Sequence, residues 1–322
     1  MAFKDPFGRQ INYLRVSLTD RCNFRCRYCR PQKNFNWLPP EAILSYEELL
    51  TILSVARKLG ISRLRLTGGE PLIRREVLRL LERLADLGFE DLALTTNGFF
   101  LAQMAQDLKT AGLKRVNVSL DSLNPQTFKE ITGVDGLKQV LRGLFAALEA
   151  GLSPVKVNVV VMRGVNHKEI PALASLSLKA PFHIRFIEFM PIGEETSWAE
   201  NLFVPEEEIR HLLEDLGPLE PAIVRGTGPA KVFRLPGAPG TIGFISSQSH
   251  AFCHRCNRLR LTPEGHLRPC LFSDQEIDLR TVLRSGGGEE EIAFAFRKAL
   301  RAKPASRTRE GGPHRSMTSI GG

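Results

Sequence analysis

The sequence predicts an α/β protein: a partial barrel of six parallel strands with helices outside, followed by an α+β C-terminal extension. Strand-like and helix-like segments alternate from residue 13 to residue 216 in units of roughly 25–40 residues, which is typical of repeated βα units. Six strands are fewer than the eight of a closed barrel. With 322 residues, of which 43% are hydrophobic, the chain is long enough to bury a large core.

The predicted elements follow in order along the chain. Strands are predicted at 13–18, 63–66, 91–95, 115–120, 155–161 and 183–189. Helices are predicted at 46–59, 75–87, 101–111, 136–150, 169–178, 205–216, 278–284 and 290–300. Ser45 and Glu48 have the spacing of a capping box at the start of the first helix.

The composition suggests three divisions of the chain. Residues 1–216 form the predicted barrel, and residues 244–322 form the C-terminal region. Between them, residues 217–243 contain eleven Gly or Pro residues in 27, which predicts a linker or an irregular cover.

Each predicted strand has one apolar and one polar face, although strands covered on both sides are normally apolar throughout. In the first strand, Arg15 alternates with Leu14 and Val16. The basic positions that we expect to point inward are Arg15, Arg65, Lys156 and Arg185. Because a buried charge without a partner costs several kcal/mol, roughly, we expect a hydrated interior that takes a large anionic ligand. The alternative is that some polar positions, such as Arg63, Arg115 and His183, lie at strand ends in solvent.

All six cysteines fall into two groups of three. Cys22, Cys26 and Cys29 form C-x3-C-x2-C, and Cys253, Cys256 and Cys270 form C-x2-C-x13-C. A cytosolic chain rarely uses disulfides, so the close spacings favour metal centres. Two iron–sulfur clusters are the preferred interpretation, and three thiolates would leave one iron of each cube open. Structural zinc is the competitor, with His254 or His266 available to complete the second group.

The loops after the first two strands carry chemistry-bearing motifs. The first cysteine group follows strand 13–18, and the sequence TGGEP follows strand 63–66. Active sites of α/β barrels lie at this C-terminal face. The glycines allow a ligand to approach the backbone, and Glu70 offers a carboxylate to an ammonium group.

These residues carry a family resemblance that spans essentially the whole chain. C-x3-C-x2-C with Tyr28 before the last cysteine, followed by GGEP, resembles the radical S-adenosylmethionine (SAM) enzymes. The second cysteine group, in CHRCNRLRL and GHLRPCLFS, and the terminal Gly321-Gly322 resemble the GTP 3′,8-cyclase family within them. That family catalyses the first step of molybdenum cofactor biosynthesis.

The resemblance implies two [4Fe–4S] clusters and SAM as cofactors. Cys22, Cys26 and Cys29 would hold the cluster that chelates SAM, and Cys253, Cys256 and Cys270 would hold the cluster that meets the guanine of GTP. The implied SAM contacts are Tyr28, Gly68, Gly69, Glu70, Ser119 and Met190. The implied GTP contacts are Arg15, Arg65, Thr96, Lys156, Arg185, Arg258 and Arg260.

The implied reaction makes 3′,8-cyclo-7,8-dihydro-GTP, a lyase reaction. A 5′-deoxyadenosyl radical from SAM would remove the hydrogen at C3′, and that carbon would then attack C8 of guanine. Reduction of the resulting radical would give the product. The tail that ends in Gly321 and Gly322 would enter the cavity. An external electron donor and a homodimer are also implied.

Charge and hydropathy limit which other functions and locations are possible. There is no apolar run of 18 residues and no secretion signal near the start, so we expect a cytoplasmic protein without a membrane-spanning helix. The net charge of +9 favours an anionic partner without separating nucleic acid from nucleotide. Two alternatives remain: a radical SAM enzyme acting on a peptide or RNA, and a zinc-stabilised nucleic-acid-binding protein. We expect no nucleic-acid partner, because neither the GGEP loop nor the inward polar faces fit one.

Overall fold

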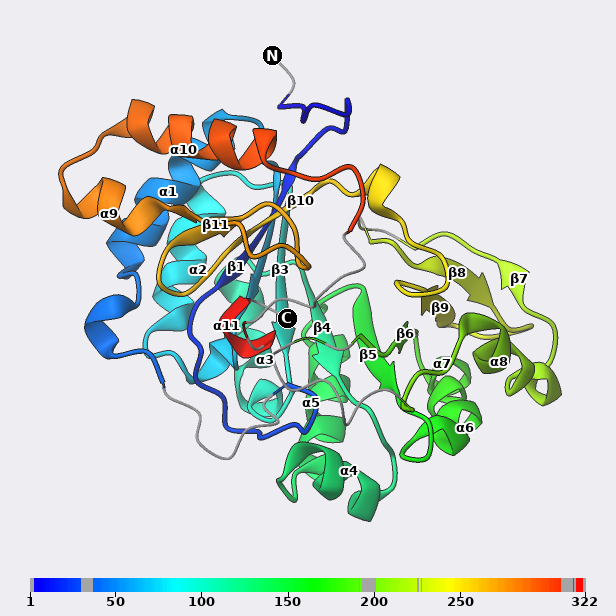
Figure 1. The fold of residues 1–322 in the computed structure, drawn as a ribbon. Coiled ribbons are helices and arrows are strands. Elements are labelled where there is room, and N and C mark those ends of the chain that lie inside the picture. The colour runs from blue at the N-terminus through cyan, green and yellow to red at the C-terminus, as the bar shows by residue number, and fades with distance from the viewer. Residues whose placement is uncertain are drawn as a thin grey trace.

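The chain folds around one curved sheet that helices cover on its outer side (Figure 1). A computed structural model describes residues 3–29, 37–190, 192, 201–224, 226, 228–307, 315 and 317–320. Twelve strands of this described part are ordered β12-β11-β10-β1-β2-β3-β4-β5-β6-β9-β8-β7. Neighbours from β10 to β9 in that order are parallel, and the outer pairs are antiparallel.

The strands and helices have these limits. The strands are β1 Tyr13–Ser17, β2 Arg63–Thr67, β3 Asp91–Thr96, β4 Arg115–Ser119, β5 Val155–Val161, β6 Phe182–Glu188, β7 Glu220–Pro221, β8 Lys231–Arg234, β9 Thr241–Ile245, β10 Arg258–Leu261, β11 His266–Arg268 and β12 Ile277–Asp278. The α-helices are α1 Tyr46–Lys58, α2 Val77–Asp86, α3 Leu101–Thr110, α4 Pro125–Thr132, α5 Leu137–Glu149, α6 Ile170–Ala174, α7 Leu176–Lys179, α8 Glu206–His211, α9 Leu279–Arg284, α10 Glu289–Arg301 and α11 Met317–Ile320. Short 3-10 helices are η1 Pro40–Ala42, η2 Pro71–Ile73, η3 His167–Glu169, η5 Glu214–Leu216 and η6 Cys253–Arg255.

The predicted α/β fold class and its six consecutive parallel strands are confirmed. Leu14 and Val16 of β1 are fully buried in the core between the sheet and the outer helices. The capping box of α1 is present: the Glu48 amide donates to Ser45 Oγ at 3.1 Å, and the Ser45 amide donates to the Glu48 carboxylate at 2.7 Å. Local sequence therefore sets both the start of the helix and the face that it buries.

Two further parallel strands flank the six that were predicted. β10 pairs with β1 and β9 pairs with β6, so the C-terminal part of the chain extends the barrel at both edges. Residues 217–243 are partly regular rather than an irregular cover: β7 and β8 lie there, and β9 begins there. Strands this short among Gly and Pro residues have no periodic signal of their own. The predicted limits 1–216, 217–243 and 244–322 stay a prediction.

The helix predictions differ from the structure in four places. α11 was not predicted, and the predicted helix 205–216 ends at His211 as α8, with the 3-10 helix η5 after it. α4 was not predicted, although the Asn124 side chain caps it and Gly133 ends it with a φ of 72°. The predicted helix 169–178 is interrupted at Ser175, where α6 ends and α7 begins. No helix in the described ranges is long and apolar enough to cross a membrane.

The last described residues lie on the inner side of the sheet, where Met317 and Thr318 line the cavity. α11 lies over the strands and apart from the outer helices (Figure 1). The backbone carbonyl of Ile320 in α11 accepts a hydrogen bond from Arg260 of β10 at 3.4 Å. Gly321 and Gly322, the predicted tail residues, lie outside the described residues.

Candidate functional site: a cavity between two cysteine groups

A cavity of about 310 Å³ lies inside the partial barrel, and all six cysteines line it. A cavity of this size is within the usual range of ligand-binding sites. The predicted residues that also line it are Tyr28, Gly68, Gly69, Ser119, Met190, Arg15, Arg65, Thr96, Arg185, Arg258 and Arg260. Of the predicted contacts, Glu70 and Lys156 are not among the lining residues.

The two cysteine groups lie at opposite ends of this cavity. Cys22 follows the C-terminal end of β1, whereas Cys256 precedes the N-terminal end of β10. Because β10 runs parallel to β1, with Arg260 beside Arg15, the two groups face each other along the strands. Strands of four or five residues are about 13–17 Å long. Two metal centres at their ends would be distinct, but ligands bound at the two centres could still meet inside the cavity.

The first cysteine loop packs tightly on the glycines that follow β2. The Gly69 amide donates to the Thr19 carbonyl at 2.7 Å, and a Cβ at Gly69 would collide with the Arg21 carbonyl. At Gly68 a Cβ would lie 2.5 Å from the Thr19 carbonyl, and its φ is 143°. Glycine is therefore required here by loop packing as well as by any ligand.

Glu70 supports the rim of the cavity from behind. Its carboxylate is fully buried and accepts hydrogen bonds from the Leu72 amide (3.0 Å), the Asn97 amide (2.7 Å) and the Thr96 hydroxyl (2.8 Å). Burial raises the pKa of Glu70 to about 7. These bonds tie the loop after β2 to the end of β3.

Two polar residues near the first cysteine group were not predicted. Asp121 accepts a hydrogen bond from the Tyr28 hydroxyl at 2.6 Å and another from the Val160 amide at 2.8 Å. Burial raises the pKa of Asp121 to about 6. Asn97 places its side-chain amide 3.8 Å from Cys22 Sγ. Each follows a predicted strand directly, and that position on the rim was the available signal.

Lys303 is the unpredicted residue of the second cysteine group. Its ammonium is 3% exposed and donates to Cys256 Sγ at 3.5 Å, to the Arg258 carbonyl at 2.8 Å and to the Pro269 carbonyl at 2.9 Å. Burial alone would raise the pKa of Cys256, but the charges of Arg258 and Lys303 lower it to about 6. Lys303 thus ties the C-terminal segment to both ends of the stretch between Cys256 and Cys270.

A row of arginines crosses the middle of the cavity. Register places Arg260, Arg15 and Arg65 side by side on β10, β1 and β2. Burial, with Arg260 and Arg65 on either side, lowers the pKa of Arg15 well below its usual value. Burial also lowers the pKa of Arg65 to about 10 and that of Arg185 to about 9. Like charges in register favour an anion between them.

The local partners of these arginines leave room for such an anion. Arg185 donates to the Asn117 side chain at 2.9 Å, and Arg65 lies 5.5 Å from the centre of the Tyr13 ring. Within the described ranges neither has a carboxylate ion pair, and neither Nε atom has a hydrogen-bond partner. Buried cations of this kind are normally compensated by a bound negative charge.

Lys156 lies beside this row of arginines and close to Gly226. It is 7% exposed, and a Cβ on Gly226 would lie 3.0 Å from its Nζ. Burial, with the nearby charge of Arg185, lowers the pKa of Lys156 to about 6. Arg115, close to the same glycine, is buried and paired with Asp91 at 2.6 Å, so it is not a solvated strand end.

The chemistry of the two thiol groups fits iron–sulfur clusters. No described cysteine forms a disulfide, and the thiols of both groups reach the cavity. Among the described residues, no three His, Cys, Asp or Glu side chains converge on a point where one metal ion would sit. In a cubane cluster, each thiolate binds a different iron.

Both halves of the chain match known protein families. The radical SAM superfamily model matches residues 16–176, and the Molybdenum Cofactor Synthesis C model matches residues 182–308. A GTP 3′,8-cyclase of Thermodesulfovibrio yellowstonii is 49% identical over 99% of this chain and 100% of its own length. Another of Moorella thermoacetica is 50% identical over 99% of this chain and all of its own.

Among solved structures, the fold is similar to that of Streptococcus suis SuiB bound to S-adenosylmethionine. The TM-score is 0.57 at 15% identity, covering 88% of this chain and 68% of that chain, which is a likeness of fold alone. The radical SAM assignment carries a [4Fe–4S] cluster and SAM, and the full-length relatives extend it to two clusters. The chain belongs to the GTP 3′,8-cyclase family of the radical SAM superfamily.

Proposed function

We propose that this chain is a radical SAM lyase that converts GTP to 3′,8-cyclo-7,8-dihydro-GTP, the first step of molybdenum cofactor biosynthesis. One observation carries the proposal: two three-thiol groups and a row of buried arginines line the same cavity. A cavity with a thiol group at each end can hold two cofactors and a polyanionic substrate between them.

The end of the cavity at Cys22, Cys26 and Cys29 is the proposed SAM site. These thiolates would hold the cluster whose open iron takes the amino and carboxylate groups of SAM. When bound, cluster and SAM supply a 5′-deoxyadenosyl radical that removes the hydrogen at C3′ of GTP. Gly68 and Gly69 would lie along the methionine part, with Glu70 behind them. Further SAM contacts are Tyr28, Ser119 and Met190.

The other end is the proposed site of the guanine base. Cys253, Cys256 and Cys270 would hold the second cluster beside it. The triphosphate is polyanionic, so it would satisfy the buried guanidiniums, which bind phosphate oxygens in pairs. The proposed GTP contacts are Arg15, Arg65, Thr96, Lys156, Arg185, Arg258 and Arg260. Lys156 is buried, and the Thr96 hydroxyl is hydrogen-bonded to Glu70. Each side chain would therefore move slightly to contact GTP.

The protein's own part in this chemistry is to orient and to shield. The cysteine loop, the glycines and Glu70 form one hydrogen-bonded rim, which fixes the distance between the radical source and the ribose. A primary alkyl radical abstracts hydrogen from any nearby C–H group, so the cavity must admit the ribose and exclude solvent and other groups. The tail ending in Gly321 and Gly322 would complete this closure.

Each turnover also needs two electrons from an external donor: one would cleave SAM, and one, with a proton, would reduce the radical that remains after the C3′ carbon has attacked C8. Arg21, Arg25 and Arg27 are exposed on the loop of the first cysteine group, which suits a donor with an acidic surface. The homodimer is a further part of the proposal, and sedimentation would test it by giving twice the mass of one chain. The reducing cytoplasm is the compartment in which thiolate-bound clusters persist, and we assign the enzyme to it.

The decisive test is anaerobic reconstitution followed by turnover. We expect about eight iron and eight sulfide per chain, and formation of 5′-deoxyadenosine that depends on GTP and accompanies the cyclised product. Two zinc atoms per chain would instead support a zinc-stabilised nucleic-acid-binding protein. If the rate of 5′-deoxyadenosine formation does not depend on GTP, the result would support a radical SAM enzyme acting on a peptide or RNA.

A further inference from the structure

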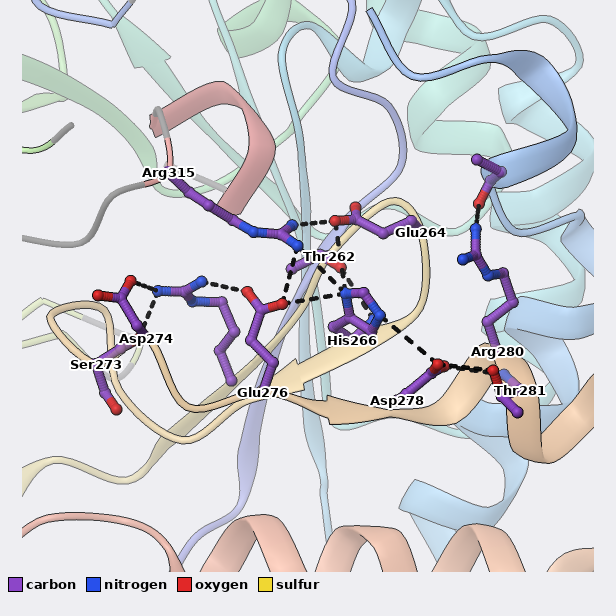
Figure 2. Close-up of polar contacts among 12 residues, drawn as sticks. Thr262, Glu264, His266, Ser273, Asp274, Glu276, Asp278, Arg280, Thr281 and Arg315 are labelled. Atoms are coloured by element: carbon purple, nitrogen blue, oxygen red, sulfur yellow. Dashed lines mark hydrogen bonds and ion pairs between the residues drawn. The ribbon is translucent and has the colours of Figure 1, made fainter. Parts of the chain in front are cut away.

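Arg315 binds two acidic side chains: Glu264 in the turn of the hairpin formed by β10 and β11, and Glu276 immediately before β12 (Figure 2). Its guanidinium donates a hydrogen bond to Glu264 through Nη1 and forms an ion pair with Glu276 through Nη2 at 2.9 Å. Nη2 also lies 3.4 Å from His266 Nδ1. Figure 2 shows Arg315 reaching this hairpin from the segment next to α11, some 50 positions later in the chain.

The acceptors of Arg315 are buried and shared. The Glu264 side chain is 6% exposed and the Glu276 side chain 17%. Glu276 is also bound by Arg268, whose side chain is 1% exposed, and by His266 at 3.1 Å. Hydrogen bonds to Glu264 and then Glu276 raise the pKa of His266 to about 9, so it is cationic at neutral pH. Arg268 and His266 therefore hold the two carboxylates through contacts that do not involve Arg315.

The segment that follows Arg315 forms part of the cavity wall. Met317 and Thr318 line the cavity between the cysteine groups. Ile320 is fully buried, and its carbonyl accepts from Arg260, one of the arginines of the central row. α11 has only four residues and cannot hold itself in place as an isolated helix. Its position depends on contacts at both of its ends.

We propose that Glu264 and Glu276 form a carboxylate clamp for Arg315, which makes Arg315 a positioning residue that fixes α11 as a wall of the substrate cavity. The consequence for catalysis rests on the proposed function. A loosened tail would lower the fraction of enzyme whose cavity is closed, and the apparent affinity for GTP would fall by that fraction.

The test compares Arg315→Gln with wild type and with Arg301→Gln, a control that removes an exposed arginine of α10. Hydrogen exchange of residues 317–320 in the reconstituted enzyme without substrate should rise at least about tenfold in Arg315→Gln and stay unchanged in the control. The KM for GTP should rise by about the same factor, with less change in kcat. Iron content should remain that of wild type. Arg315→Lys, which keeps one ion pair, should recover part of the loss.

A double mutant separates the clamp from general destabilisation. If Arg315 acts through Glu264, then exchange in the double variant with Glu264→Gln should be no faster than in the faster single variant. Tail exchange within twofold of wild type in Arg315→Gln, or an equal rise in the control, would overturn the proposal. The exchange measurement needs no substrate, so a failure of the proposed function appears separately, as wild-type enzyme that forms no cyclised product from GTP.

Discussion

The two ends of the cavity carry the same three-thiol arrangement in opposite electrostatic surroundings. At the first end, burial, the neighbouring Cys29 and the carboxylate of Asp121 raise the pKa of Cys26 well above its usual value. At the second end, the charges of Arg258 and Lys303 outweigh burial and lower the pKa of Cys256. The sign of the nearest charged group therefore differs between two otherwise similar sites.

This difference shows how one cavity can sort two ligands. SAM carries a cationic sulfonium, which an acidic neighbour attracts and an arginine repels. A nucleoside triphosphate has the opposite preference. Under the proposed function, the charges placed around each thiol group would therefore determine which ligand binds there.

The largest expected effect comes from removing one thiol at each end. Cys22→Ala should abolish 5′-deoxyadenosine formation, and Cys270→Ala should leave SAM binding largely intact but abolish cyclisation. Each variant should retain about four of eight irons, because each end holds its own cube. Iron analysis and product chromatography measure both. Cyclisation by Cys270→Ala would show that the second cysteine group is not required for cyclisation and that the two ends do not have separate roles.

The next effect concerns the central arginines. Arg260→Ala should weaken GTP binding by about 10–150-fold, which corresponds to the 1.5–3 kcal/mol typical of a hydrogen bond to a charged group. SAM binding, measured by anaerobic calorimetry, should change little. Equal losses for both ligands would mean that the arginine row is structural. An unchanged affinity for GTP would remove Arg260 from the site.

Lys303 tests the second end alone. Lys303→Met removes a cation and an N–H donor from Cys256, so the midpoint potential of the second cluster should fall by on the order of tens of millivolts. Lys303→Arg, which keeps both charge and donor, serves as the matched control. A potentiometric titration followed by EPR measures each cluster. A shift confined to the first cluster would contradict this assignment.

The smallest effect is expected at Asp121. Asp121→Asn keeps an acceptor for the Tyr28 hydroxyl but removes the charge, so SAM should bind about threefold to tenfold more weakly. In wild type, SAM affinity should fall as the pH drops through about 6, where Asp121 becomes protonated. The variant should lack that dependence. A pH-independent affinity in wild type would exclude a charge effect at the first end.

Strand alternation was the most informative part of the sequence. Because side chains on a strand alternate between two faces, burial of Leu14 and Val16 forces Arg15 to the interior, and Arg65 and Arg185 follow by the same rule. The structure confirms that all three line the cavity. The cysteine spacings indicated two metal centres, but spacing alone could not place the two groups at opposite ends of one cavity.

The residues that sequence reasoning missed depend on long-range packing. Lys303 lies in a basic stretch that resembles a solvated tail, and only the fold brings it to Cys256, 47 positions away. Glu70 was expected to face a ligand, but the end of β3 takes its carboxylate instead. The pairing of β9 and β10 with the barrel edges gave no local signal, because short strands choose partners by tertiary context.

The position of β1 has a consequence for how the molecule is made. Tyr13–Ser17 lies between β2 and β10, so one of its two neighbours is translated some 245 residues later. Until that partner leaves the ribosome, an apolar edge of the nascent sheet stays open to pairing with other chains. The cavity between the two cysteine groups is thus completed last. A prematurely terminated chain would lack β10 and would be prone to aggregate before the cavity could form.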